Sequence, residues 1–494
     1  MEWRGVESIP LYFDSLQYFM FVPAVLAAYQ FMPSRWRWAV LLGASVAFYA
    51  ALRMPLLVFA WAFVVLISYW LGRRISDESN VVRRRTYLWA GVAAHVVILC
   101  SIKYLRAILR LIVPGFEPAG GMDWFSTLGI SYYTLQAVSY LADVYLGTAE
   151  PERHLGRFAL YLGFFPKLLQ GPIERAGDLL PQLRSLGSFN YANVRSGALL
   201  FCWGLFKKVA VANRLAPFVT AVYYDPHGYS GYSLIAATYM YALQILADFS
   251  GYTDMALGVA RMFNIRLTEN FKYPYFATSI ADFWRRWHIS FSRWILDYIF
   301  KPLQIEWRTA GKVGVVAALM VTFFFSGLWH GVALTFIAWG LLHGVYLASS
   351  VLLKPWREAA YRKIGLANHP FRRVFQLIVT FNLVAFAWIF FRARSIADGW
   401  YIATHLFVGV ATRISYATAV RGGVMGAILN GGSARDFAML GAAMSVWLLG
   451  STLIKTVRLQ EQPIWFRWSM YYALILALVF LNAHDDVGFV YFQF

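Results

Sequence analysis

The chain has 494 residues, of which 60% are hydrophobic, 18% are aromatic and only 14% are charged. Because an ordinary soluble domain carries about 25% charged residues, this composition excludes a series of soluble domains and indicates one polytopic membrane domain. The formal net charge of +19 does not indicate a nucleic-acid-binding protein, because the basic residues form short clusters between apolar runs.

Twelve apolar stretches, each long enough or nearly long enough to cross a bilayer, follow one another along the chain. They cover residues 11–32, 38–52, 54–71, 87–113, 124–147, 196–222, 231–260, 313–329, 331–353, 372–391, 434–454 and 466–483. We therefore predict an all-α, polytopic membrane protein with about eleven or twelve transmembrane helices. Cys100 and Cys202 stand apart in apolar stretches, which argues against a thiol metal site.

The basic clusters predict which loops face the cytoplasm, because Lys and Arg accumulate in the cytoplasmic loops of membrane proteins. The loop at 72–85 carries five arginines, and the loop at 354–373 carries six basic residues. Two smaller groups are Arg35 with Arg37, and Lys455 with Arg458 and Arg467. Placing all four groups inside puts the N-terminus outside, and it puts His330 deep in the membrane or toward its outer half.

Residues 152–183 are apolar but interrupted. The interruptions are Pro166, Gly171, Pro172 and Pro181, and the charges among them include Lys167, Glu174 and Arg175. Irregular backbone at membrane depth must line a cavity or be buried in protein, so this segment is predicted to be re-entrant. A loop that lies among the lipid headgroups is the alternative.

Residues 279–303 are predicted to form one amphipathic helix. Its apolar face carries Trp284, Trp287, His288, Phe291, Trp294, Ile295 and Tyr298, and the opposite face carries Asp282, Arg285, Arg286, Arg293 and Asp297. Because Trp and Arg are so dense, this helix is predicted to lie along the cytoplasmic interface. His288 falls within the apolar arc and is therefore expected to point inward.

His330 stands in the apolar run VTFFFSGLWHGVALTFIAWGLL, where its neighbours cannot replace lost hydration. Polar groups at membrane depth often mark sites of chemistry, and a buried neutral imidazole can take a proton from a hydroxyl, as acyl transfer requires. The alternative is a packed histidine that bonds backbone carbonyls. The sequence contains no nucleophile elbow, Walker loop or His-Glu-x-x-His motif, so hydrolase, NTPase and metal-peptidase functions lack support.

A polar cluster, LADFSGYTD, interrupts the apolar stretch at 231–260. With the residue one turn before it, it supplies Gln244, Asp248, Ser250, Tyr252 and Asp254. Two carboxylates at membrane depth need partners, and we expect Arg285 or Arg286 to supply them. The cluster either lines a reaction chamber or forms a structural network of ion pairs and caps.

Three further residues have two possible roles each. Lys167 and Arg175 are candidates for binding the phosphates of a CoA or phosphopantetheine arm, and ordinary positive-inside charge is the alternative. For His343, which follows His330 in the next apolar stretch, packing in the core is the default expectation.

Six motifs occur in series and carry a family resemblance. They are ISYYTLQAVSYLADVY (130–145), FFPKLLQGPIERAGDLLPQL (164–183), LFKKVAVANRLA (205–216), ADFSGYTDMALGVARMFNI (247–265), NFKYPYFATSIADFWRRWHISFSRWILDYIFKPL (270–303) and SGLWHG (326–331). The chain resembles the membrane-bound O-acyltransferase family, and within it the branch that acetylates alginate and other exopolysaccharides. The likeness runs from about residue 10 to the terminal YFQF (491–494), and a more distant one is to teichoic acid D-alanyl transfer proteins.

The resemblance implies a single domain over 1–494, with its core at about 125–350 and C-terminal helices at about 370–494. It implies a ring of helices around a thinned centre, in a bacterial inner membrane. His330 matches the histidine regarded as catalytic in the family, and His288 matches the upstream position. Trp329, which precedes His330 directly, and Arg285, a candidate partner of the buried carboxylates, join the predicted lining.

The resemblance also implies a reaction. The donor is acetyl-CoA or another acetyl thioester from the cytoplasm, and an acetylesterase-like periplasmic partner passes the acetyl group to an extracytoplasmic polysaccharide near its export complex. We expect His330 to be the general base and His288 to orient the donor. Open alternatives are D-alanyl transfer from a carrier protein to teichoic acid, a proton- or ion-coupled transporter, and a non-catalytic scaffold. The longer C-terminal part, with a Gly-rich stretch at 420–436, fits the acetylating branch better.

Overall fold

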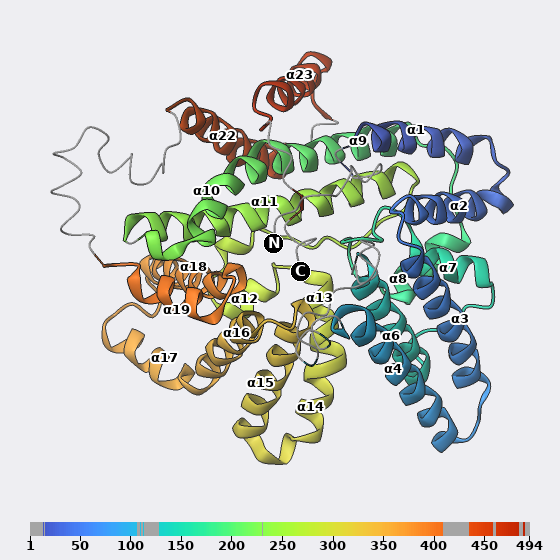
Figure 1. Ribbon diagram of the computed structural model, residues 1–494, viewed down its shortest axis with the longest axis horizontal. Helices are drawn as coiled ribbons and strands as arrows, with labels where there is room; N and C mark the ends of the chain where they lie inside the picture. The colour runs from blue at the N-terminus through green and yellow to red at the C-terminus, as the bar shows by residue number, and fades with distance from the viewer. Residues whose placement is uncertain are drawn as a thin grey trace. The chain divides into compact units, whose positions relative to one another are not determined.

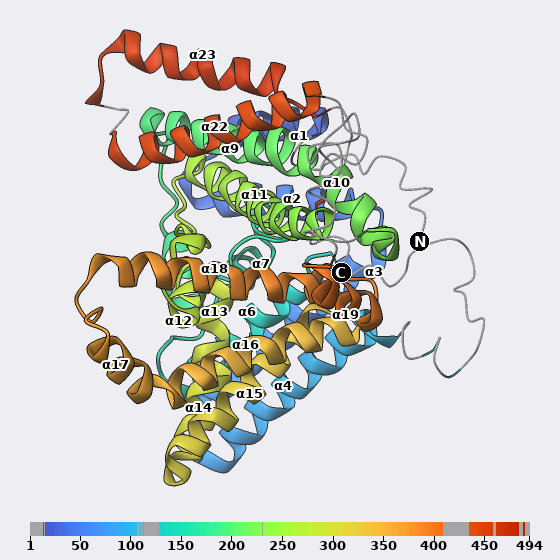
Figure 2. The same ribbon diagram turned by 90° about the vertical axis from the view of Figure 1, so that its left-hand side faces the viewer.

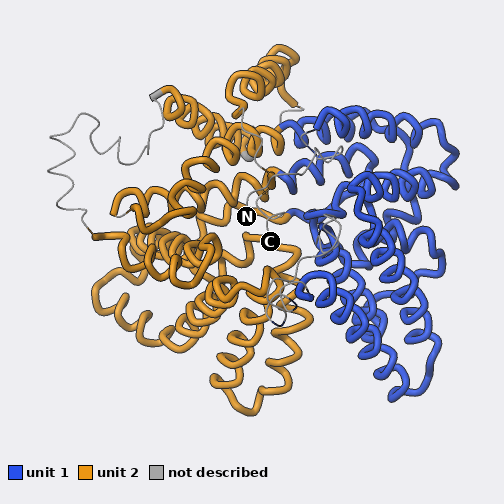
Figure 3. Tube along the Cα trace, viewed as in Figure 1, with its two compact units in different colours: residues 1–202, 252–269, 494 blue, residues 203–251, 270–493 orange. Residues whose placement is uncertain are grey.

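The computed structural model describes residues 15–105, 128–229, 231–408, 434–457, 461–483 and 488–489, and the isolated positions 13, 109 and 112. Within these ranges the regular elements are all helices, which confirms the all-α prediction (Figures 1 and 2). The Gly-rich stretch at 420–433 and the terminal YFQF lie outside the described residues. The chain divides into two compact units, which are coloured in Figure 3.

Unit 1 comprises residues 1–202, 252–269 and 494, and unit 2 comprises residues 203–251 and 270–493. The two units alternate along the sequence, because residues 252–269 of unit 1 interrupt unit 2. The prediction of a single membrane domain over 1–494 is not tested by this division and stays a prediction.

Unit 1 contains the helices of the first two fifths of the chain. They are α1 (Leu16–Phe31), α2 (Arg37–Ala50), α3 (Pro55–Asp77), α4 (Val81–Lys103), α6 (Ile130–Leu146), α7 (Leu155–Gly163), α8 (Ala176–Arg184) and most of α9 (Tyr191–Phe206). Local sequence explains where several begin. Pro55 occupies the first turn of α3, where its missing N–H costs nothing, and Asn80 caps α4 by accepting from the N–H groups of Val82 and Arg83.

Apart from short 3₁₀ turns, unit 2 contains the remaining described helices. They are η2 (Lys207–Ala212), α10 (Asn213–Tyr224), α12 (Ile280–Trp284), α13 (Ile289–Ile295), η5 (Leu296–Phe300), α14 (Lys301–Glu306), α15 (Gly311–His330), α16 (Leu334–Leu352), α17 (Lys354–Lys363), α18 (Pro370–Arg392), α19 (Ile396–His405), α22 (Ala434–Thr456) and α23 (Ile464–Phe480). Helix α11 (Tyr232–Met262) starts in unit 2 and ends in unit 1. Helices α15 and α16 lie side by side in both views (Figures 1 and 2).

Among the residues that the structure describes, six helices are long and apolar enough to cross a membrane, so the protein is a multi-pass membrane protein. They cover Pro55–Asp77, Val81–Lys103, Arg308–His330, Leu334–Leu352, Pro370–Arg392 and Arg435–Ile454, and two shorter apolar helices are Leu16–Phe31 and Ile464–Phe480. All twelve apolar stretches predicted from the sequence coincide with described helices, at least in part.

The interrupted segment at 152–183 is broken where its prolines and glycines predict, with one exception. Helix α7 ends at Gly163, and no regular helix follows until α8 begins at Ala176. Almost every residue between these two helices is buried, as irregular backbone in a membrane protein must be. The predicted break at Pro181 is wrong, because Pro181 lies inside α8.

Candidate functional site

The predicted helix over 279–303 departs from regular α-helical geometry in two places, a break and a π-helical turn. Helix α12 ends at Trp284, α13 starts at Ile289, and the π-helical turn η5 follows α13. The break lies at His288, whose backbone is left-handed with φ 42° and ψ 55°. The prediction of one continuous helix is therefore wrong.

The break has a physical cause in the preceding loop. The carbonyl of Asn270 accepts from the N–H of Ile289 at 3.0 Å, and its side-chain Oδ1 accepts from the N–H of Ser290 at 3.1 Å. The N–H of Lys272 donates to the carbonyl of Arg286 at 2.9 Å. These bonds take backbone groups that a continuous helix would have paired internally.

The predicted division into two faces holds despite the break. Trp284, Trp287, His288, Phe291 and Trp294 are buried, and Arg285 and Arg293 are exposed. Arg286 and Arg285 pair with Asp282 on their own segment, at 3.0 and 3.7 Å. The cytoplasmic interfacial position of this segment stays a prediction.

His330 is the last residue of α15 and is 4% exposed. Its position depends on close packing between α15 and α16, where a Cβ added to Gly340 would overlap the Phe323 carbonyl oxygen. The His330 ring stands perpendicular to Trp339, with centroids 5.0 Å apart, and it lies edge-on to Phe391 at 5.0 Å. The end of α15 is thus enclosed by aromatic rings from α16 and α18.

The two histidines contact the same pair of aromatic rings. Phe291 and Trp329 stack with centroids 4.4 Å apart. His288 lies 5.1 Å from Phe291 and 6.3 Å from Trp329, and His330 lies 5.9 Å and 4.9 Å from the same two rings. The structure therefore brings His288, His330 and Trp329 together within unit 2, and their roles in one site stay a prediction.

His288 is buried among aromatic rings. It is 1% exposed, and the ring of Phe249 from α11 lies edge-on to it at 4.8 Å. Burial lowers the pKa of His288 to about 3, because a low dielectric disfavours the charged imidazolium. His288 is therefore neutral at physiological pH.

Asp248 precedes Phe249 and does not pair as the sequence suggested. Its Oδ1 accepts from Nζ of Lys208 at 2.8 Å, and both side chains are 1% exposed. Lys207 donates to Ser250 Oγ at 3.3 Å. The expectation that Arg285 or Arg286 would be the partner of Asp248 is thus wrong.

The two lysines were missed by sequence reasoning, although their signal was visible. Two consecutive lysines in the apolar run LFKKVAVA need buried counter-charges if the run is helical and enclosed. Here the run forms the π-helical turn η2, a rare conformation that is frequent at functional sites. Gln244, one turn before Asp248, is 5% exposed, and its Oε1 has no hydrogen-bond partner among the described residues.

His343, on α16, is a third buried histidine of unit 2. It is fully buried, with ring neighbours that include Trp284 at 5.1 Å and Trp339 at 5.2 Å. Its Nδ1 accepts from the indole N–H of Trp284 at 3.3 Å. This environment agrees with the default expectation of a packed histidine.

The other predicted residues, Lys167, Arg175, Tyr252 and Asp254, lie in unit 1. Lys167 is fully buried, and its Nζ donates to Oε1 of Gln136 and to the carbonyl of Leu162 at 3.4 Å. Burial lowers the pKa of Lys167 and raises that of Glu174, whose carboxylate accepts from the N–H of Thr268 at 2.6 Å. These contacts engage Lys167 within unit 1, and its binding to donor phosphates stays a prediction.

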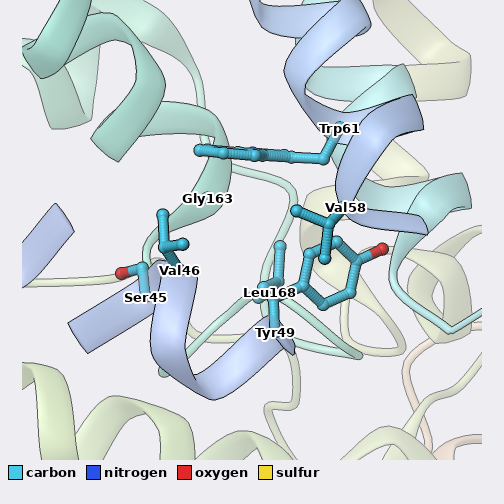
Figure 4. Close-up of a pocket in the computed structure, with 7 residues that line it drawn as sticks. All are labelled: Ser45, Val46, Tyr49, Val58, Trp61, Gly163 and Leu168. Carbon is cyan, nitrogen blue, oxygen red and sulfur yellow. The ribbon is translucent and has the colours of Figure 1, made fainter. Parts of the chain in front are cut away.

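Unit 1 also contains a shallow crevice (Figure 4). Its lining residues are Ser45, Val46, Tyr49, Val58, Trp61, Gly163 and Leu168. The hydroxyl of Ser45 donates to the Leu41 carbonyl and accepts from the N–H of Phe165. The crevice is thus mainly apolar and lacks a general base. In the part of the chain that the structure describes, no three His, Cys, Asp or Glu residues form a group that could hold a metal ion.

Comparisons with known proteins identify a family. Residues 153–391, which include His288 and His330, match the family model described as MBOAT, membrane-bound O-acyltransferase family. A probable alginate O-acetylase of Azotobacter vinelandii is 34% identical over 397 residues, which cover 79% of this chain and 76% of that protein. A peptidoglycan O-acetyltransferase of Helicobacter pylori is 32% identical, over 73% of this chain and 71% of that protein. A teichoic acid D-alanyltransferase of Bacillus subtilis is 28% identical, over 67% of this chain and 82% of that protein.

Proposed function

This chain belongs to the membrane-bound O-acyltransferase family, and on that premise we propose that it moves an acetyl group from a cytoplasmic thioester across the membrane for O-acetylation of an extracytoplasmic polysaccharide. The observation that carries the proposal is the placement of His288 and His330 against one stacked pair, Phe291 and Trp329. The acetylating relatives in two bacteria support the choice of acetyl over D-alanyl transfer.

His330 acts as the general base in this proposal. Its neutral imidazole takes the proton from the acceptor hydroxyl as the oxygen attacks the thioester carbonyl carbon. The C–O bond forms, the C–S bond breaks, and the leaving thiolate takes the proton back from the imidazolium. The surrounding aromatic rings limit access of water, which would otherwise hydrolyse the thioester.

His288 orients the donor. Since burial keeps its imidazole neutral, it can serve as a hydrogen-bond donor and acceptor but carries no charge toward an incoming thioester. An acyl-imidazole on His330 is a less favoured variant, because an activated hydroxyl can attack a thioester directly.

The donor and the partners complete the proposal. Acetyl-CoA or another acetyl thioester enters from the cytoplasmic side of a bacterial inner membrane. An acetylesterase-like periplasmic protein receives the acetyl group and delivers it to the polymer near its export complex. The arginine-rich loop at 72–85 and the basic residues at 354–373 support this orientation, with the N-terminus extracytoplasmic.

Transfer from labelled acetyl-CoA in inside-out vesicles tests the proposal. We expect label on an extracytoplasmic partner or polymer with the wild-type chain, and none with His330→Ala at equal membrane abundance. Unchanged acetylation by His330→Ala would contradict the assigned role and favour a scaffold. Transfer from a D-alanyl thioester only would favour the D-alanyl alternative, and proton flux without acetyl transfer would favour a transporter.

A further inference from the structure

We propose that Asn270 is a positioning residue for the transfer centre, and that it holds His288 in the left-handed conformation that places its imidazole against Phe291 and Trp329. This inference rests on the proposed function, because it assigns Asn270 a part in the same reaction. Asn270 itself is 1% exposed and lies 18 residues before His288 in the chain.

The conformation of His288 requires an explanation. A positive φ is uncommon for residues other than glycine, because Cβ then approaches the backbone. Such strain persists only where the surroundings impose it, and it is concentrated at functional sites. His288 is one of four non-glycine residues with positive φ among the described residues, and it is the only histidine of the four.

His288 is also the N-cap of α13, but its own side chain makes no capping bond. A helix N-terminus leaves its first N–H groups without internal partners, and Ser, Thr, Asp or Asn at the N-cap normally satisfies them. Here Asn270 supplies both acceptors, its carbonyl for Ile289 and its Oδ1 for Ser290. Because Asn270 caps the helix from a distance, the N-cap position can hold an imidazole that serves another purpose.

The residue after Asn270 strengthens the same arrangement. The Phe271 ring lies edge-on to Phe249 and to Trp287, at 5.0 Å in each case. Phe249 in turn contacts the His288 ring at 4.8 Å. The segment that begins at Asn270 therefore fixes the backbone on one side of His288 by hydrogen bonds and the surrounding rings by packing.

The side-chain amide nitrogen of Asn270 takes no part in the capping. Its Nδ2 is buried without a hydrogen-bond partner among the described residues, although buried amides are nearly always satisfied. The capping bond to Ser290 uses only Oδ1. A variant that keeps the oxygen and removes the N–H donors therefore separates capping from any other role of the amide.

Steady-state transfer from labelled acetyl-CoA tests this inference in the full-length protein in lipid nanodiscs. We expect Asn270→Ala to lower kcat at least tenfold with KM changed less than threefold, because a small misplacement of a site group is costly in rate. Asn270→Asp, which keeps the Oδ acceptor for Ser290, should restore kcat to within about threefold of wild type. The matched control is Asn80→Ala, which removes a similar cap from α4 and should leave kcat unchanged.

A double-mutant comparison shows whether Asn270 acts through His288. In a His288→Ala background, Asn270→Ala should cause no further loss of kcat. An additional tenfold loss there, or wild-type kcat in Asn270→Ala, would overturn the inference. If Asn270→Ala does not fold, Asn270→Ser keeps a shorter acceptor and should give an intermediate kcat at a near-native Tm. A wild-type protein that shows no transfer would contradict the proposed function instead.

Discussion

Lys208 and Asp248 form an ion pair inside unit 2, with Nζ and Oδ1 2.8 Å apart and each side chain only 1% exposed. Nζ of Lys208 also lies against the face of the Phe489 ring, 4.2 Å from the ring centroid. Removing one partner of a buried ion pair costs about 3–5 kcal/mol. Asp248→Ala should therefore lower the free energy of unfolding by about that amount, measured by thermal unfolding in nanodiscs.

The exposed pair of Lys301 and Asp297 is the matched control. Its atoms are similarly close, 2.7 Å apart, but the side chains are 57% and 38% exposed, and exposed pairs contribute about 0–1 kcal/mol. Asp297→Ala should thus change Tm little. A Tm for Asp248→Ala equal to that of Asp297→Ala would show that the buried pair is not structural.

Replacing both partners of the buried pair separates structure from chemistry. The double variant Lys208→Met with Asp248→Leu should recover most of the stability lost by Asp248→Ala, because buried ion pairs are often matched by apolar residues of similar volume. If this variant folds and transfers acetyl groups normally, the network is structural. If it folds with near-native Tm and has lost transfer, Asp248 or Lys208 belongs to the reaction chamber.

The two buried histidines of the α15–α16 pair should respond differently to the same substitution. His330→Phe should abolish acetyl transfer, because the imidazole is the proposed base. His343→Phe should keep at least a tenth of wild-type transfer, since a phenyl ring preserves the packing against Trp284 and Trp339. The His343→Phe variant should lose about 1–3 kcal/mol of stability, because the buried Trp284 N–H loses its acceptor. Loss of transfer in a stably folded His343→Phe would show that His343 takes part in the reaction.

The sequence predicted the helices well because apolar length and periodicity follow directly from burial in lipid or protein. It also placed His288 and Trp284 on one buried face, since local spacing determines which side chains share a side. It could not predict the break at His288, because the group that imposes it belongs to Asn270, 18 residues earlier. The pairing of Asp248 with Lys208, 40 residues earlier, was missed for a different reason: the two lysines in the apolar run indicated a need for counter-charges, but local spacing does not show which carboxylate supplies them.

The membrane orientation can be tested by cysteine labelling, after Cys100 and Cys202 are changed to Ala. Single cysteines at Ser79 and Lys363 should react with an impermeant maleimide only in inside-out vesicles. This expectation follows from the arginines on either side of Ser79 and the basic residues of α17.

Cysteines at Gly228 and Ala397 should show the opposite pattern and react in intact spheroplasts. Both positions are exposed, and one apolar helix, α18, separates Ala397 from Lys363. Labelling of Lys363→Cys and Ala397→Cys from the same side would contradict a membrane-spanning α18. Reversal of all four positions would contradict the orientation while preserving the topology.

The burial of His288 predicts how stability changes in acid. His288 lies outside the six candidate spans, and burial lowers its pKa to about 3, against about 6.5 in an unfolded chain. The contribution of neutral His288 to the free energy of unfolding is therefore fully present above pH of about 6.5. It is lost as the pH falls toward 3, because only the unfolded chain takes up the proton. At pH of about 5 this linkage costs about 2 kcal/mol.

His288→Asn removes this titration and keeps a residue that tolerates positive φ. Between pH of about 7.5 and 5, its free energy of unfolding should fall by about 2 kcal/mol less than that of the wild type. His227→Asn, at an exposed histidine, is the control and should follow the wild type. If His288→Asn and the wild type lost equal stability over this interval, His288 would have to take up its proton in the folded protein. It would then be charged in acid beside Phe291, and the neutral, donor-orienting role proposed for it would fail below the pH of that titration.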